Sequence, residues 1–225
     1  MSRLNIFFGH FLELRTTAIK SFVIYLIFFI AMIPFANEIY SFFSQPLLDQ
    51  LIGLNGLVIS TKLTATFLVP FKITAYCALI ASLPFIFYQF WNFISPGLYK
   101  KERQFVILIM IFAFLLFLSG TLFVYFLIFP IIFNFFISVT PEDVELMIDI
   151  SSYLEMIIAL FIAFGLAFEV PLVLITAVKF NWIKIKTLEN NRKYIIVAAF
   201  IFGAIFTPPD ILSQILLALP ILFLF

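Results

Sequence analysis

Four long apolar runs constrain this chain more than any other feature of its sequence. They cover residues 21–40, 71–93, 105–136 and 153–178, and each is long enough to cross about 30 Å of hydrocarbon as a helix. Hydrophobic residues make up 64% of the 225 and charged residues 11%, more apolar surface than a soluble core can bury. The sequence therefore predicts an all-α polytopic membrane protein with a single membrane domain, residues 1–225.

Two shorter apolar runs follow, at residues 194–206 and 211–225. As helices they would be about 20 and 22 Å long, which fits either two short spans or a re-entrant pair. The segment between them contains Pro208, Pro209 and Asp210. Because neither proline can donate a backbone hydrogen bond or continue the preceding helix, this segment predicts a tight turn.

The distribution of basic residues predicts the orientation. Eleven of the thirteen lie in the amino-terminal segment and in alternate connections, on one side of the predicted spans. By the positive-inside rule that side is cytoplasmic, so the amino terminus is predicted inside, and the carboxyl end too if both short runs cross. The first outside connection, residues 41–70 with Pro46, predicts a structured cap with short helices. The eleven are Arg3, Arg15, Lys20, Lys100, Lys101, Arg103, Lys179, Lys184, Lys186, Arg192 and Lys193.

Several classes of function lack their sequence signals. The single cysteine, Cys77, and the single histidine, His10, cannot build a metal or haem site between them. There is no phosphate loop, no hydrolytic motif and no basic patch interleaved with aromatic residues. We therefore expect no cofactor, no nucleic-acid partner and no enzymatic activity. The polar, amphipathic start of the chain also predicts that no signal peptide is cleaved.

Glu169 stands out among the charged residues because it lies inside an apolar run. It is about nine residues from the predicted cytoplasmic end, roughly 13 Å deep. An acid at such depth costs on the order of 2.5–3.5 kcal/mol, so it should be neutral, paired or beside a polar cavity. Pro171 removes one backbone donor two positions later. The pair predicts a polar notch in the membrane, with a purely structural hydrogen bond as the alternative.

Two more acids lie on the predicted cytoplasmic side. Glu102 stands among Lys100, Lys101 and Arg103, and Glu13 lies in a segment with the apolar spacing of an interfacial helix. From charge alone, Glu102 could equally well form a surface salt bridge, and Glu13 fits a solvated helix face better than a binding site. Together they suggest a cationic ligand presented from inside, because a carboxylate binds a guanidinium through two hydrogen bonds.

Five stretches, in order, resemble the TatC family, the large subunit of the twin-arginine protein translocase. The first is the H-x-x-E-L-R pattern of residues 10–15. The others are residues 88–103, 163–171, 191–194 and 206–214, and the resemblance covers nearly the whole chain with its spacings preserved.

The resemblance implies a receptor for folded cargo whose signal peptides carry two consecutive arginines. It implies that Glu13 and Glu102 contact the arginine pair with Phe93 nearby, and the expected site also includes Arg15, Lys101 and Arg103 from the same motifs. It implies that Glu169, with Pro171 and Gln214, contacts single-span TatA- or TatB-type partners. We expect structural roles for the prolines and the acid of the outside connections. These are Pro46, Pro208, Pro209 and Asp210.

The family fold is a glove-like bundle of six transmembrane helices whose last two are short, which favours crossing over a re-entrant pair. Because the chain stops at Phe225, we expect the sixth span to be incomplete. The family uses the proton-motive force, and self-association is expected. A bacterial cytoplasmic membrane is the expected location, with an organellar inner membrane left open. A proton-coupled secondary transporter using Glu169 and a non-transporting membrane scaffold are the alternative functions.

Overall fold

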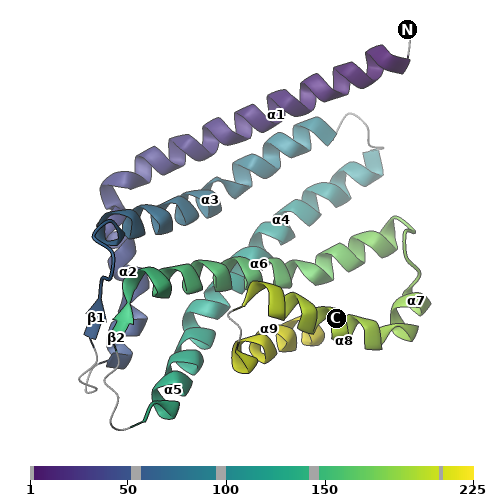
Figure 1. Cartoon of the computed structure of the whole chain (residues 1–225). Coiled ribbons are helices and arrows are strands. Elements are labelled where there is room, and N and C mark those ends of the chain that lie inside the picture. The colour runs from purple at the N-terminus through teal and green to yellow at the C-terminus, as the bar shows by residue number, and fades with distance from the viewer. Residues whose placement is uncertain (1–2, 52–56, 95–99, 142–146, 208–209) are drawn as a thin grey trace. The chain divides into compact units, whose positions relative to one another are not determined.

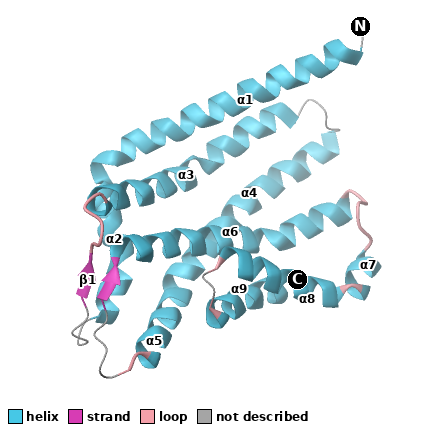
Figure 2. Cartoon of the chain, in the orientation of Figure 1, coloured by secondary structure: helices cyan, strands magenta, loops and turns pink. Residues whose placement is uncertain are grey.

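The computed structural model describes residues 3–51, 57–94, 100–141, 147–207 and 210–225, and this part of the chain is almost entirely helical (Figures 1 and 2). The residues form two compact units. One contains Met1–Ile39 and Pro70–Phe114, and the other contains Tyr40–Val69 and Leu115–Phe225. The helices are α1 Arg3–Met32, α2 Ala36–Leu51, α3 Ala65–Ile94, α4 Lys100–Phe123, α5 Phe129–Val139, α6 Ile150–Lys179, α7 Ile185–Asn190, α8 Arg192–Phe206 and α9 Ile211–Leu224.

Four helical segments are long and apolar enough to cross a membrane, as the four runs predict. They cover Leu12–Asp49, Ala65–Phe93, Arg103–Val139 and Ile150–Lys179. Many of their large apolar side chains are exposed, among them Phe22, Ile30, Leu108 and Val173, which suits contact with lipid. The prediction of a helical multi-pass membrane protein is confirmed. The number of six spans and their orientation remain predictions.

The first predicted span continues further than its apolar run. After α1 a single 3₁₀ turn, Ile33–Phe35, contains Pro34 near its start, and α2 then runs through Pro46. A proline inside a helix leaves the carbonyl four residues earlier without its helical donor. Here that carbonyl belongs to Phe42, and the hydroxyl of Tyr125 donates a hydrogen bond to it at 3.1 Å. This replacement donor explains why the helix tolerates Pro46.

The third run forms one helical path interrupted in its middle. A π-helical segment, Val124–Ile128, joins α4 to α5. Buried aromatic rings pack here against α2 and α6 in the second unit. Phe129 lies with its ring centroid 5.4 Å from that of Phe161, which is also 5.4 Å from Phe43. Phenylalanines therefore pack in the core of this unit and are also exposed on its surface.

A short pair of parallel strands lies in the second unit. Leu57–Ile59 (β1) pairs with Met147–Asp149 (β2) in the register Leu57 to Met147. Asp149 holds the end of the pair. One carboxylate oxygen accepts from the backbone N–H and the hydroxyl of Thr61 at 3.0 Å, and the other accepts from Ser152 at the start of α6 at 3.2 Å. The Thr61 backbone donor, followed by those of Ser152, lowers the pKa of Asp149 to about 2.

Two glycines bring α4 and α6 into close contact. A Cβ atom on Gly120 would lie 2.7 Å from the backbone oxygen of Phe164, and one on Gly165 would lie 2.6 Å from the ring of Phe117. Small residues allow helix backbones to approach in this way inside a membrane. The two glycines are 45 positions apart, so no short-range glycine motif in the sequence reveals the contact.

The end of α6 is a left-handed turn. Asn181 has a φ of 60°, and the backbone N–H groups of Asn181 and Trp182 donate to the carbonyls of Val178 and Ala177. This is the Schellman pattern, which needs a residue that tolerates a positive φ, and asparagine does so better than most. The turn leads the chain through α7 into α8, which packs beside α9 (Figure 1).

The glycine contact predicts different costs for two substitutions of equal size. In Gly120→Ala the new methyl group meets backbone atoms of α6, so the helices must move apart. In Gly165→Ala it meets the Phe117 ring, which can rotate. We expect Gly120→Ala to lower the free energy of unfolding by about 1–3 kcal/mol and Gly165→Ala by less. Thermal unfolding of both variants in detergent measures this, and equal losses would contradict it.

The Asp149 network predicts a dependence of stability on pH. Its pKa in the folded protein is about 2, below the ordinary value of 3.8, so the charged carboxylate stabilises the fold above about pH 4. That contribution should disappear as the pH falls from about 4 to about 2. Asp149→Asn should therefore be less stable than wild type at pH 7, and the difference should shrink at low pH. A difference in thermal midpoint that stays constant between pH 7 and pH 2 would rule this out.

Candidate functional site

A polar pocket between α1 and α3 contains two of the predicted site residues. Its volume is about 420 Å³, and it lies wholly within the first unit. Glu13 and Phe93 line it from opposite helices. The lining consists of one acid, one lysine, hydroxyls and amides beside an apolar edge, namely Leu12, Glu13, Thr16, Thr17, Lys20, Gln89, Asn92 and Phe93.

Helical spacing explains why these side chains meet. Positions 13, 16, 17 and 20 repeat at three and four residues, so they share one face of α1. On α3, positions 89, 92 and 93 share a face in the same way. Thr16 bonds back to the carbonyl of Leu12 at 2.8 Å, so its hydroxyl hydrogen is turned toward its own helix. Thr16, Thr17, Lys20 and Asn92 were not among the predicted site residues, although helical spacing from Glu13 would have revealed the first three.

The structure places two of the predicted cations, Arg15 and Arg103, outside the lining of this pocket. Arg15 is exposed and does not line it, because residues two apart on a helix point to different sides. Arg103 places its guanidinium carbon 5.6 Å from the ring centroid of Trp91, which is buried. This cation–π contact joins α4 to α3 within the first unit. Lys101 and Glu102 belong to the first turn of α4, but their side chains lie outside the described residues.

The pocket can hold a positively charged group with hydrogen-bonding hydrogens. The Glu13 carboxylate accepts hydrogen bonds only, whereas the side-chain oxygens of Gln89 and Asn92 add neutral acceptors. Phe93 supplies an apolar and aromatic edge on which a planar guanidinium can stack. Because Glu13 is exposed, the site is reached from solvent and contributes little to stability by itself.

The membrane acid Glu169 lies in the second unit, in the middle of α6 and half-buried. Its carboxyl reaches the backbone of Phe117 in α4. Gly165 stands one turn earlier on the same face, so the close contact of α4 and α6 places the acid against α4. Pro171 follows within the helix and frees the carbonyl of Ala167.

The last two helices hold the remaining predicted residues. Gln214 in α9 donates a hydrogen bond to the carbonyl of Phe200 in α8 at 2.9 Å, and Gly203 leaves room for it. Asp210 caps α9, accepting from the backbone N–H of Ser213 at 2.6 Å. Pro46 lies inside α2 as described above. Pro208 and Pro209 lie outside the described residues.

An apolar groove in the second unit includes Phe168, the residue before Glu169 in α6. Phe168 of α6 borders it together with residues of α4, the π-helical segment and α9, and its volume is about 550 Å³. Every described residue that lines it is apolar. They are Phe123, Leu127, Ile128, Phe168, Leu216, Leu219, Pro220, Phe223 and Leu224.

Comparison with known proteins identifies the family. A family model described as "Sec-independent protein translocase protein (TatC)" matches residues 9–220. A relative of that name from Azotobacter chroococcum is 42% identical over 217 residues, which cover 96% of this chain and 85% of the relative. The relative from Escherichia coli K12 is 40% identical over 216 residues, covering 96% of this chain and 83% of the relative.

A solved structure is also similar. The crystal structure of a twin-arginine translocase receptor, TatC, superposes with a TM-score of 0.80 at 33% identity, covering 96% of this chain and 94% of that one. The long apolar helices and the bacterial relatives place the protein in the bacterial inner membrane as a multi-pass protein. The resemblance seen in the five sequence motifs is therefore confirmed, and this chain belongs to the TatC family of Sec-independent protein translocase proteins.

Proposed function

We propose that this protein is the receptor subunit of a twin-arginine translocase and binds the arginine pair of signal peptides at the pocket of Glu13. The observation that carries the proposal is the grouping of an acid, two amides and Phe93 between α1 and α3. The similarity to the crystal structure of a twin-arginine translocase receptor supports it. Glu102 is the second acid that we propose for the arginine pair, since it follows the same α3–α4 connection in sequence.

We propose that the apolar groove bordered by Phe168 receives a single-span helix of a TatA- or TatB-type partner. A helix in lipid gains by packing into such a groove, and a polar group on it can bond to the Glu169 carboxyl. The proton-motive force would drive transport. The 15-residue α8 supports a local thinning of the bilayer, because a helix of that length does not reach across about 30 Å.

The arginine site predicts that neutral variants bind the signal peptide less well. Glu13→Gln and Glu102→Gln each remove a carboxylate but keep the size of the side chain. We expect each to reduce crosslinking of an Arg-Arg precursor to the reconstituted protein by about tenfold, which corresponds to about 1.4 kcal/mol. Glu38→Gln, in the first turn of α2, is the control and should crosslink like wild type.

Replacement of the precursor's arginine pair by two glutamines should abolish the difference between wild type and the two variants. If Glu13→Gln crosslinks the Arg-Arg precursor as well as Glu38→Gln does, the pocket is not the site. If only Glu102→Gln crosslinks the precursor like the control, Glu102 has no role in binding the arginine pair. The pocket of Glu13 then remains the proposed site.

The partner groove predicts a separate loss. Leu219→Trp fills the groove with a larger side chain, whereas Leu115→Trp places the same ring on α4 outside it. The two leucines are 56% and 51% exposed, so the two substitutions are matched. We expect Leu219→Trp to reduce co-purification of the single-span partner at least about fivefold while precursor crosslinking is unchanged. Equal co-purification of the two variants would exclude this groove as the partner's place.

A further inference from the structure

The polar pocket of the first unit contains a cation as well as an acid. Glu13 and Lys20 both line it, and both belong to α1. Seven residues of an α-helix make almost two whole turns, so these two side chains leave the helix on the same side. At 1.5 Å of rise per residue, their backbones lie about 10.5 Å apart along the helix axis. The pocket therefore has a negative group and a positive group at two different levels of one wall.

The opposite wall of the pocket comes from α3. The two helices run in opposite directions beside each other, and the ring centroids of Phe28 and Phe85 are 5.3 Å apart (Figure 1). Seven positions back along α1 and seven forward along α3 from this contact lead to positions 21 and 92. Because both helices rise equally per residue, Lys20 lies at about the level of Asn92. The amide group of Asn92, which also lines the pocket, adds a hydrogen-bond donor at that level.

The ammonium group of Lys20 is available to a ligand. The side chain is exposed, and it forms no ion pair or hydrogen bond with the described part of the chain. A lysine near the cytoplasmic end of a membrane helix also anchors that helix at the interface, but such an anchor does not require a polar pocket beside it. An ammonium group donates three hydrogen bonds and accepts none, so the ligand group that suits it best is a carboxylate.

The distance between the two charged residues sets a spacing on a bound peptide. An extended chain advances about 3.4 Å per residue, so it covers the rise from Glu13 to Lys20 in about three residues. A peptide that places an arginine at Glu13 and lies along the pocket therefore brings the side chain about three residues away to Lys20. An acidic side chain at that place would be attracted, and a basic one would be repelled.

We propose that Lys20 is a specificity-determining residue of the signal-peptide pocket. Its ammonium group binds an acidic side chain about three residues from the arginine that Glu13 holds. The pocket thus recognises two opposite charges at a fixed spacing, and not the arginine alone. This proposal rests on the receptor function proposed above, because that function supplies the arginine at Glu13.

The test is an aspartate scan of an Arg-Arg precursor that is crosslinked to the reconstituted full chain at low ionic strength. Aspartate is placed in turn at each position up to about five residues on either side of the arginine pair, and lysine at the same position is the comparison. On one side, about two to four residues away, we expect wild type to crosslink the aspartate precursor about fivefold better, the usual upper effect of an exposed ion pair. Added salt should weaken this preference, because exposed charges are screened.

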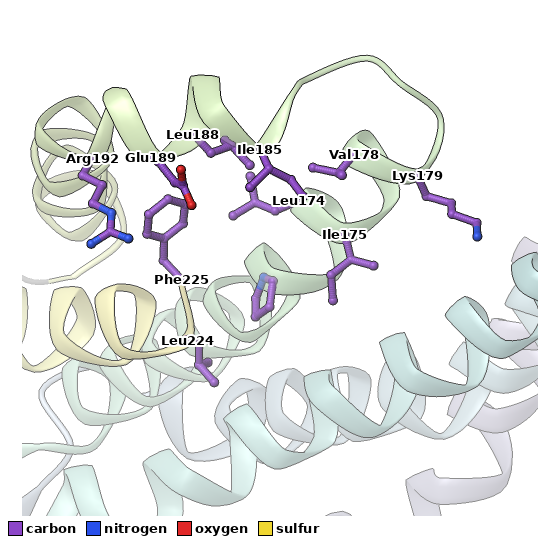
Figure 3. Close-up of a pocket in the computed structure, with 11 residues that line it drawn as sticks. Leu174, Ile175, Val178, Lys179, Ile185, Leu188, Glu189, Arg192, Leu224 and Phe225 are labelled. Atoms are coloured by element: carbon purple, nitrogen blue, oxygen red, sulfur yellow. The ribbon is translucent and has the colours of Figure 1, made fainter.

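Two substitutions of Lys20 and one matched control complete the test. Lys20→Gln should lose the preference for aspartate, and Lys20→Glu should reverse it in favour of the lysine precursor. Lys179→Gln is the control, because it removes the same charge from an exposed side chain at the end of α6, in the other unit. The side chain of Lys179 extends away from Arg192 (Figure 3). This variant should keep the wild-type preference.

The role of Lys20 and the receptor function fail in different ways. If crosslinking depends on the arginine pair and on Glu13, but wild type shows no preference for aspartate at any position, only the role of Lys20 is overturned. The same holds if Lys20→Gln keeps the preference as Lys179→Gln does. If crosslinking depends on neither the arginine pair nor Glu13, both proposals are overturned. The gain that Lys20→Glu should show with the lysine precursor cannot arise from misfolding, so the test stays decisive if Lys20→Gln folds poorly.

Discussion

Every backbone N–H and C=O group of this protein that lies in hydrocarbon must find its partner inside the protein, because lipid offers none. The long helices satisfy these groups through their internal hydrogen bonds. Each proline within a helix removes one of those bonds. The carbonyl that Pro46 frees on Phe42 receives the hydroxyl of Tyr125. Elsewhere threonines bond back to carbonyls of their own helices, as Thr74 does to Pro70 and Thr176 to Leu172. Polar side chains within the apolar runs thus bond to backbone groups first, and Glu169, whose carboxyl reaches the backbone of Phe117, is among them.

The local features of the fold could be predicted from the sequence. The apolar runs give the long helices, and the short runs give α8 and α9 with boundaries within about two residues. The contacts between distant segments could not. Two glycines 45 positions apart, and strands of three residues each, leave no periodic signal, since their partners are chosen by packing in three dimensions. The continuation of α2 through Pro46 depends on the distant Tyr125, so it could not be predicted from the sequence either.

The residues of the candidate site also differ in whether they could be predicted from local sequence. Glu13 and Phe93 were identified through motifs, and the rest of the α1 face follows from helical spacing once Glu13 is chosen. Arg15 shares the motif of Glu13 but not its face, which shows that nearness in sequence and nearness in a helix differ. Arg103 was grouped with the site by its position in a motif, whereas its contact with Trp91 could be found only in the structure. The contact of Glu169 with α4 likewise depends on Gly165, a residue that no charge-based reasoning would select.

The pairing of β1 with β2 has a consequence for how the chain assembles. The two strands are about 90 positions apart, and each is too short to persist without the other. Closing a loop of that length has an entropic cost that the three paired residues can offset only after the intervening helices are in place. The strand pair should therefore form late in folding, after the helices between β1 and β2 have brought the two strands together. Its late closure would then join two connections that are synthesised at different times.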